Sequence, residues 1–171
     1  GVYILNTDMA TFEGNEFFSN TASRGGGTRL ISVPDVSVLR DHYCDNSTDG
    51  TIGGAVLLSD GGEVSSVWTN TIFNENIANT AGGALYADNH DIELRNNLFL
   101  TNDATDGGAI YLDESDYSLI NTVVAWSVGG DGIDANWLTG GTYSMDYNNW
   151  YLNTTSNYAG SLGSSSLGSN S

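Results

Sequence analysis

The sequence contains no lysine, and its four basic residues are all arginine, at positions 24, 29, 40 and 95. Its 21 acidic residues give a formal net charge of −17. A surface of this sign repels nucleic acid and anionic membranes, so we expect neither as a partner. It attracts cations, calcium among them, and it suits saline surroundings, where screening relieves the repulsion between like charges.

Cysteine and long apolar runs are also scarce. The single cysteine, Cys44, cannot form a disulfide within the chain, so no disulfide framework defines the fold. His42 lies two residues away, but no third group is evident that would orient it as the base of a nucleophilic pair. No stretch approaches the roughly 18 apolar residues of a membrane-spanning helix, and no signal peptide is recognisable. We therefore expect no membrane insertion.

What the sequence does contain is a repeat. An apolar residue is followed five positions later by a second one, usually aromatic, and three positions after that usually by Asn, as in Leu94, Phe99 and Asn102. The central residue falls at 17, 43, 73, 99, 124 and 150, so successive copies are 26, 30, 26, 25 and 26 residues apart. Glycine pairs recur in the same rhythm, at 26–27, 53–54, 82–83 and 107–108. A fixed period in this range predicts a solenoid.

Each copy has the pattern of short strands rather than of a helix. Ile92 and Leu94 alternate with Glu93, and such runs are broken by Gly, Asn, Asp and Ser. The only proline is Pro34. We therefore predict an all-β fold, a parallel β-helix of about six coils with three short strands per coil. The β-helix should span residues 1–160 and begin in the middle of a coil, and the Ser/Gly-rich residues 161–171 should form a tail or linker.

The repeated positions predict two internal ladders. The central residue should point inward and stack on its counterpart about 4.8 Å away in the next coil. The Asn should lie at a turn, where it tolerates left-handed backbone angles and can bond its neighbours above and below. The glycine pair should supply positive φ angles. The predicted ladder residues are Phe17, Asn20, Tyr43, Asn46, Phe73, Asn76, Phe99, Asn102, Val124, Trp150 and Asn153.

Two segments carry the pattern most clearly: Phe73 and Asn76 followed by Gly-Gly-Ala-Leu at 82–85, and Phe99 and Asn102 followed by Gly-Gly-Ala-Ile at 107–110. This pattern resembles the repeat of the polymorphic outer-membrane-protein family and is similar to that of other secreted right-handed β-helix proteins. The resemblance covers nearly the whole chain. It implies a right-handed β-helix, an extracellular or cell-surface location and a role that is often adhesion, sometimes as an autotransporter passenger.

The first residues resemble the middle of a coil and have no polar cap before them. An uncapped solenoid end exposes unpaired backbone groups. We therefore expect either end-to-end stacking with other copies, giving a homo-oligomer, or continuation in a longer chain.

Acidic turns are the candidate metal sites. The turns at 88–91 and 113–116 place carboxylates at the same point of neighbouring coils, and residues 129–134 match the start of a calcium-binding nonapeptide. Carboxylate oxygens are ligands that calcium prefers, although a solvated acidic edge is the simpler interpretation. The candidate calcium ligands are Asp88, Asp91, Asp113, Asp116, Asp131, Asp134 and Asn136. Residues 59–63 predict a protruding loop, a common place for binding function.

The sequence predicts no catalytic set. A β-helical polysaccharide lyase needs a basic residue beside bound calcium, and Arg40 and Arg95 are offset from each other in the repeat. We therefore predict a non-catalytic extracellular or cell-surface structural module, adhesin-like or fibre-forming. The alternative is a carbohydrate-binding or carbohydrate-cleaving β-helix. An exposed aromatic column would favour the alternative, and its candidate residues are Trp126, Trp137, Tyr147 and Tyr151.

Overall fold

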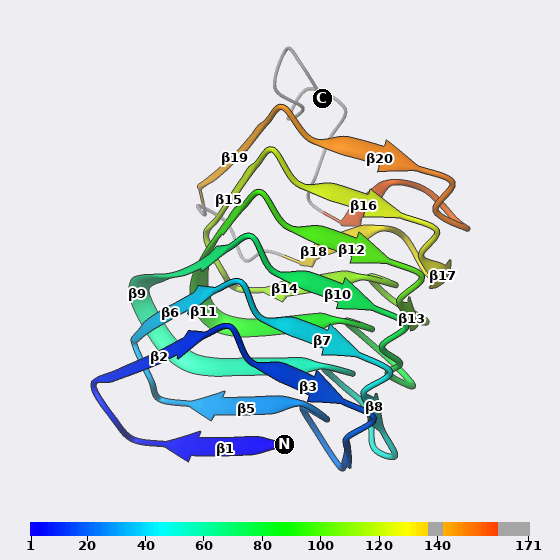
Figure 1. Ribbon diagram of the computed structural model, residues 1–171. Helices are drawn as coiled ribbons and strands as arrows, with labels where there is room; N and C mark the ends of the chain where they lie inside the picture. Colours follow the sequence, from blue (N-terminus) through cyan, green and yellow to red (C-terminus); the bar gives the residue numbers. More distant parts are fainter. Residues whose placement is uncertain (137–141, 161–171) are drawn as a thin grey trace.

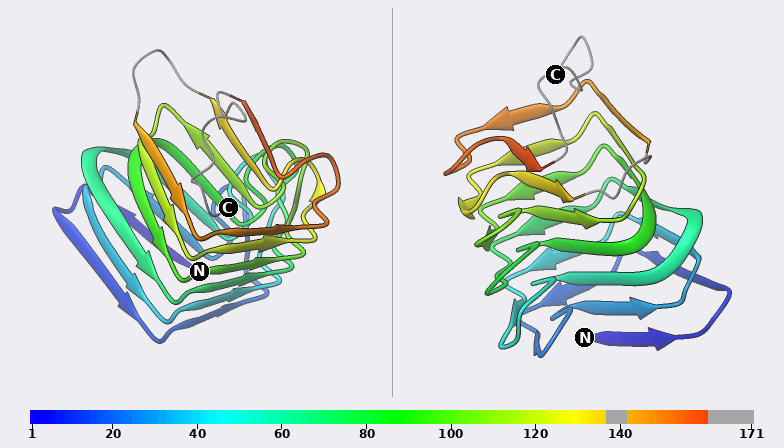
Figure 2. Two further views of the ribbon diagram at one scale, coloured as in Figure 1. Left: turned by 90° about the horizontal axis from the view of Figure 1, so that it is seen from above. Right: turned by 180° about the vertical axis from the view of Figure 1, so that it is seen from behind.

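The computed structural model describes residues 1–136 and 142–160, without the side chains of residues 63–65 and 160. These residues form a parallel β-helix of about six coils, which wind right-handed from the N-terminal to the C-terminal end (Figures 1 and 2). The described residues contain no helix. The predicted fold class is therefore confirmed.

Each coil has three sides, and each side continues from coil to coil as parallel strands. The first side contains β1 (Val2–Leu5), β5 (Thr28–Ile31), the start of β9 (Val56–Thr69), the start of β11 (Leu85–Arg95), β14 (Ile110–Asp113), β18 (Ile133–Asn136) and β21 (Tyr158–Gly160). The second side contains β2 (Met9–Glu13), β6 (Asp35–Leu39), the ends of β9 and β11, β15 (Tyr117–Ile120) and β19 (Tyr143–Asp146).

The third side is a separate six-stranded sheet. Its strands are β3 (Glu16–Phe18), β7 (His42–Cys44), β10 (Ile72–Asn74), β12 (Leu98–Leu100), β16 (Val123–Ala125) and β20 (Asn149–Tyr151). Very short strands follow it in most coils: β4 (Thr21–Ala22), β8 (Ser47–Thr48), β13 (Asp103–Ala104) and β17 (Val128–Gly129).

The protruding loop predicted at residues 59–63 is wrong, because these residues continue strand β9. Strands β9 and β11 both bend around the corner between the first and second sides without a break (Figure 1). The pairing between them shifts register on either side of His90. The extra residues of this coil are thus absorbed as a bulge in the strand instead of projecting as a loop.

An aromatic column fills the interior behind the third side. In strand register it consists of Phe17, Tyr43, Phe73, Phe99, Val124 and Trp150. The rings of its first four members are nearly parallel, with centroids 4.5, 5.1 and 4.5 Å apart in that order. Apolar residues of the first and second sides, such as Leu58 and Leu94, complete a single core. The structure therefore places the residues of the predicted column inside the coils.

The two members of each glycine pair have different structural roles. Gly82 has a φ of 63°, whereas Gly83 lies so close to the next coil that a Cβ there would be 2.2 Å from the carbonyl oxygen of Gly108. Only the first glycine therefore needs positive φ, and the second is needed for close approach between coils. The register also pairs Gly26 with Gly54, since Thr28 pairs with Val56, so the second coil's pair is 25–26 rather than 26–27.

Candidate binding surface

The Asn ladder is a continuous column of hydrogen bonds in the first four coils. Both the backbone N and the Nδ2 of Asn46 donate to Oδ1 of Asn76, each at 3.0 Å, and Asn76 repeats the pair of bonds to Asn102. Nδ2 of Asn76 also donates to the carbonyl oxygen of Tyr43 at 3.0 Å. All three asparagines are fully buried. The ladder thus satisfies backbone groups at a corner where no sheet can do so.

The left-handed residue at this corner is the one before the Asn, and not the Asn itself as predicted. These preceding residues have φ between 49° and 56°, and they are Ser19, Asp45, Glu75, Thr101, Trp126 and Leu152. The Asn that follows each of them turns inward instead and bonds the neighbouring coils. Repeat spacing locates the corner but does not tell which of two adjacent residues adopts the unusual backbone.

The ladder breaks at Ser127, which replaces Asn in the fifth coil. Its Oγ is buried and has no hydrogen-bond partner among the described residues. The column resumes one coil later, where Oδ1 of Asn153 accepts from the backbone N of Ser127 at 3.0 Å. A serine hydroxyl is too short to bridge the coils as the amide does.

A second polar ladder lies at the corner before the third side and was missed by the sequence analysis. It occupies the position two residues before each aromatic-column residue: Asn15, Asp41, Thr71, Asn97, Thr122 and Asn148. Oδ1 of Asn97 accepts from the backbone N of Thr71 at 2.8 Å, and its Nδ2 donates to the carbonyl oxygen of Trp68 at 2.8 Å. The only sequence signal was a polar residue of varying type at a fixed spacing.

Asp41 is the ionisable member of this second ladder and is 1% exposed. Its Oδ1 accepts from the backbone N of Asn15 at 2.7 Å. Burial raises the pKa of the Asp41 carboxyl, and the bonds from Asn15 oppose that rise. The carboxyl group therefore has a structural role in a position that elsewhere takes an amide.

The predicted calcium ligands do not come together. Among residues 1–136 and 142–160, no group of three or more His, Cys, Asp or Glu side chains is placed to hold a metal ion. Oδ1 of Asp91 accepts from the backbone N of Asp116 at 2.9 Å, and both carboxylate oxygens of Asp116 accept from Thr142 at 2.7 Å. These stacked carboxylates cap backbone groups of the next coil, which explains their spacing without a metal.

The other candidate calcium ligands are also engaged or separate. Oδ1 of Asp113 accepts from Nδ2 of Asn136 at 3.1 Å, and Oδ1 of Asp131 accepts from Ser156. Burial raises the pKa values of Asp88 and Asp134, and nearby carboxylates raise them further. The described residues therefore give no support to the calcium prediction.

A Ser–His pair among the described residues lies inside the coil. Oγ of Ser66 hydrogen-bonds Nε2 of His90, and both residues are fully buried. Nδ1 of His90 has no partner among the described residues, and a Cβ on Gly61 would lie 1.9 Å from it. Burial lowers the pKa of His90 to about 4. A substrate has no access to this pair, so it belongs to the bulged corner of β9 and β11 and not to a reactive site.

The arginines considered for lyase chemistry are paired with glutamates at the surface. Arg40 contacts Glu13, and Arg95 contacts Glu93. Cys44 is half-buried on the third side, where Nδ2 of Asn74 approaches its Sγ at 3.8 Å. Neither arrangement sets a base beside a nucleophile.

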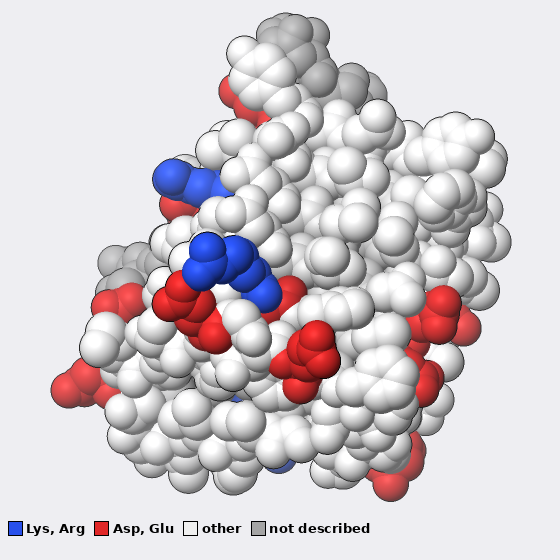
Figure 3. Space-filling view, viewed as in Figure 1, with Lys and Arg blue, Asp and Glu red and all other residues white. Residues whose placement is uncertain are grey.

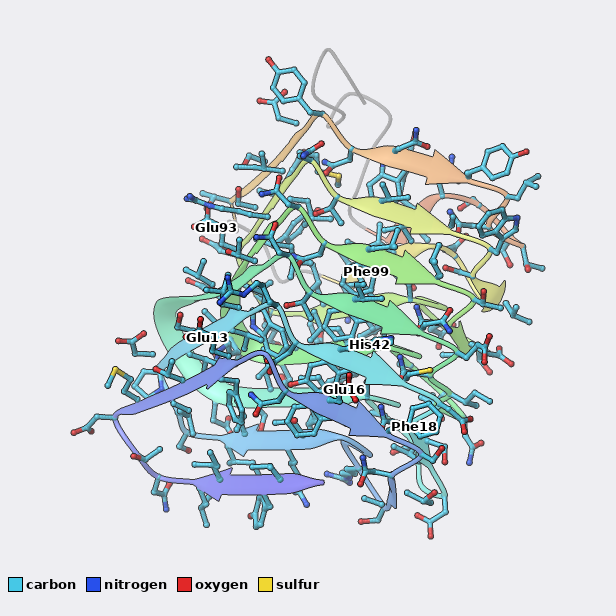
Figure 4. The ribbon with its side chains drawn as sticks, viewed as in Figure 1. Glu13, Glu16, Phe18, His42, Glu93 and Phe99 are labelled. Atoms are coloured by element: carbon cyan, nitrogen blue, oxygen red, sulfur yellow. The ribbon has the colours of Figure 1, made fainter. Side chains whose placement is uncertain are left out.

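The outer surface of the third side is the least charged face of the chain. Phe18 and His42 project outward from β3 and β7, whereas Phe99 of β12 lies inside (Figure 4). We call the outward-facing residues of this sheet the third-side face; they are Glu16, Phe18, His42, Cys44, Ile72, Asn74, Leu98, Leu100, Val123, Ala125, Asn149 and Tyr151. From β10 to β20 none of them is charged. Figure 3 shows this uncharged area with acidic side chains along its edges.

An aromatic cluster lies at one end of this face. Trp126 and Tyr151 are 47% and 53% exposed, and their rings meet edge to face with centroids 5.7 Å apart. Of the other aromatic candidates, Tyr147 is exposed at the opposite corner of β20, and Trp137 lies outside the described residues. The structure thus brings together two of the four aromatic residues named for a glycan.

Comparisons with protein-family models, with curated proteins and with solved structures found no match for this chain. Within the described part of the chain, no helix has the length and apolar character to cross a membrane.

Proposed function

We propose that this chain is a non-catalytic structural module of an extracellular or cell-surface protein, adhesin-like or fibre-forming, which acts by presenting a rigid face. The observation that carries the proposal is the third-side face: a largely apolar sheet surface, uncharged from β10 to β20, on a chain with a net charge of −17. Contiguous apolar surface of this kind marks an interaction site.

The use of the polar interior supports a scaffold over an enzyme. Buried Asn and Asp side chains of both ladders accept hydrogen bonds from backbone groups of neighbouring coils. Arg40 and Arg95 are paired with glutamates, and the Ser66–His90 pair is buried. These polar side chains are thus engaged with other parts of the β-helix, which favours a scaffold over an enzyme.

Electron microscopy of the purified chain tests the fibre-forming version. Parallel strands at the ends of a solenoid can pair with those of another copy, so stacked copies would give rods much longer than the coil stack of one chain. The proposal predicts such rods or ordered bundles in concentrated NaCl, where screening reduces the repulsion between acidic copies. Isolated particles at every salt concentration would contradict fibre formation.

A carbohydrate-binding module is the second candidate, and the Trp126–Tyr151 pair favours it. Exposed aromatic rings stack on the apolar faces of sugars, and Trp126 holds a left-handed backbone conformation that is unfavourable for a bulky side chain. A glycan array with wild type, Trp126→Ala and Tyr147→Ala tests it. Binding that is lost in the first variant and kept in the second would establish the pair as a glycan site, and no binding by wild type would remove this candidate.

A further inference from the structure

We propose that the third-side face is the contact surface between two copies of this chain, packed face to face. This inference rests on the proposed structural function and names the partner of its surface. It follows from what the face exposes, from the charge around it and from its size.

The face leaves large apolar side chains in water. Phe18, Ile72 and Tyr151 are 66%, 38% and 53% exposed, and Leu98, Leu100 and Val123 lie half-buried between them. In β10, β12 and β16 the only polar side chain directed outward is Asn74. A surface with so few hydrogen-bonding groups is poorly suited to a polar ligand and matches another flat apolar sheet, since sheets pack face to face about 10 Å apart.

The distribution of charge favours a second copy of this chain as the source of the facing sheet. Two chains of net charge −17 repel each other wherever their carboxylates meet. On the first side, Asp88 pairs in register with Asp113, and on the second side Glu13 and Glu93 lie at the surface. Face-to-face contact through β10, β12 and β16 brings no carboxylate of the sheet opposite another.

The face also has the symmetry that a two-fold contact needs. A two-fold axis parallel to the strands, between β10 and β12, places each strand over its counterpart from the other end of the sheet. Ile72 then lies over Leu98 of the second copy, and Phe18 lies over Tyr151. Glu16 is the only acidic residue of the face. It lies over Asn149 of the second copy, and not over Glu16 of that copy.

The size of the face predicts a weak, salt-dependent dimer. Six strands about 4.8 Å apart and three residues wide offer roughly 300 Å² per copy, less than half of what a standard stable interface buries on each partner. Repulsion between the copies weakens the contact further at low salt and fades as the screening length falls to about 3 Å at 1 M. We therefore expect monomers in dilute buffer and dimers in concentrated salt.

Sedimentation equilibrium at 0.05 M and 2 M NaCl tests the inference, with protein from micromolar to millimolar concentration. We expect wild type to dimerise at 2 M NaCl and Ile72→Glu to weaken dimerisation at least tenfold. The matched control is Met9→Glu, which adds the same charge at a 60% exposed apolar residue of the second side. It should change dimerisation less than twofold. Unchanged melting temperatures would exclude unfolding as the cause.

A charge-rescue experiment guards against a merely repulsive effect. Leu98→Arg should also weaken self-association, whereas a mixture of Leu98→Arg and Ile72→Glu chains should form heterodimers, because opposite charges then face each other. Failure of the mixture to associate would overturn the face-to-face contact. So would wild type that stays monomeric at millimolar concentration in 2 M NaCl, or equal weakening by Ile72→Glu and Met9→Glu.

Electron microscopy of Ile72→Glu separates this inference from the fibre-forming function. Rods that persist in a variant unable to dimerise would leave the function intact and confine the face to lateral contacts between rods. Rods seen with a wild type that never dimerises would overturn this inference alone. Loss of glycan binding in Ile72→Glu, with wild type monomeric, would assign the face to a sugar instead.

Discussion

The first four coils and the last two share one repeat but use it differently. Up to β12 the aromatic column and the Asn ladder are unbroken. Beyond it, Val124 replaces the ring and Ser127 replaces the amide, and neither restores the missing contact. The same two coils place Trp126, Tyr147 and Leu152 at left-handed corners, where they are 47–64% exposed.

This difference indicates which coils contain residues in unfavourable backbone conformations. Bulky side chains in left-handed backbone cost about 1–2 kcal/mol each, and such strain collects at functional sites. In the earlier coils the corresponding corners hold residues such as Ser19, Asp45 and Asn96. We infer that the first coils are built for rigidity and that the last coils give up part of it to display apolar groups.

The largest expected effect comes from removing one rung of the ladder in each region. Asn76→Ala deletes the acceptor of Asn46 and the donor to Tyr43, and it leaves several buried polar groups unpaired. We expect it to lower the free energy of unfolding by about 3–5 kcal/mol. Asn153→Ala, in the half-exposed last coil, should cost only about 1–2 kcal/mol. Urea denaturation measures both, and equal losses would contradict the distinction between the regions.

The bulged corner predicts a pH dependence of stability. His90 titrates at about 4 in the folded chain and near 6.5 when unfolded, so only the unfolded chain binds its proton as the pH falls between these values. Stability should therefore decrease from pH 6.5 towards pH 4, in total by about 3 kcal/mol. Denaturant titrations of wild type and His90→Gln from pH 7 to 5 check this, because the variant lacks the titrating group.

The raised pKa values of Asp41, Asp88 and Asp134 act in the opposite direction. They favour the folded chain as the carboxylates become protonated, which restricts the clean test of His90 to pH values above about 5. If the two proteins show parallel pH profiles in that range, the buried histidine is not the cause.

Restoring the missing asparagine of the ladder at position 127 should stabilise the last two coils. In Ser127→Asn, the new Oδ1 would accept from the backbone N and Nδ2 of Asn102, and the new Nδ2 would donate to the carbonyl oxygen of Phe99, as Asn102 does to Phe73. We expect a gain of about 1–2 kcal/mol in the free energy of unfolding. Ser127→Ala serves as the control and should change stability little, since the hydroxyl has no partner among the described residues.

The smallest expected effect concerns the second ladder. Asp41→Asn replaces a buried carboxylate by an amide, whose Nδ2 would donate to Phe12 as that of Asn97 does to Trp68. Since the folded pKa of Asp41 is raised, its charge destabilises the fold at neutral pH, and the penalty disappears below the unfolded value of about 4. We expect a gain of about 1 kcal/mol at pH 7 and none at pH 3. A destabilised variant at pH 7 would show that the bonds from Asn15 outweigh burial.

The fold and the inward columns were predictable because period and alternation depend only on residue type at fixed spacing. Phe73, Phe99, Asn76 and Asn102 show this. The second ladder was not predictable, since Asp41, Thr71 and Asn97 share polarity but not type. The bulge in β9 and the capping bonds of Asp91 and Asp116 depend on three-dimensional register, so a loop and a calcium site were predicted there instead. The third-side face is formed by outward residues of six strands that are far apart in the sequence, so it depends on the sheet order.

The most direct test of the division between the two regions is native-state hydrogen exchange by NMR. The amides of Asn46 and Asn76, which donate to the next asparagine, should exchange only through global unfolding. The amides of Val128 and Gly132, in the coil beyond the break, should exchange through a partial opening of lower free energy. Equal protection in both regions, or greater protection beyond Ser127, would contradict a rigid ladder that ends at this residue.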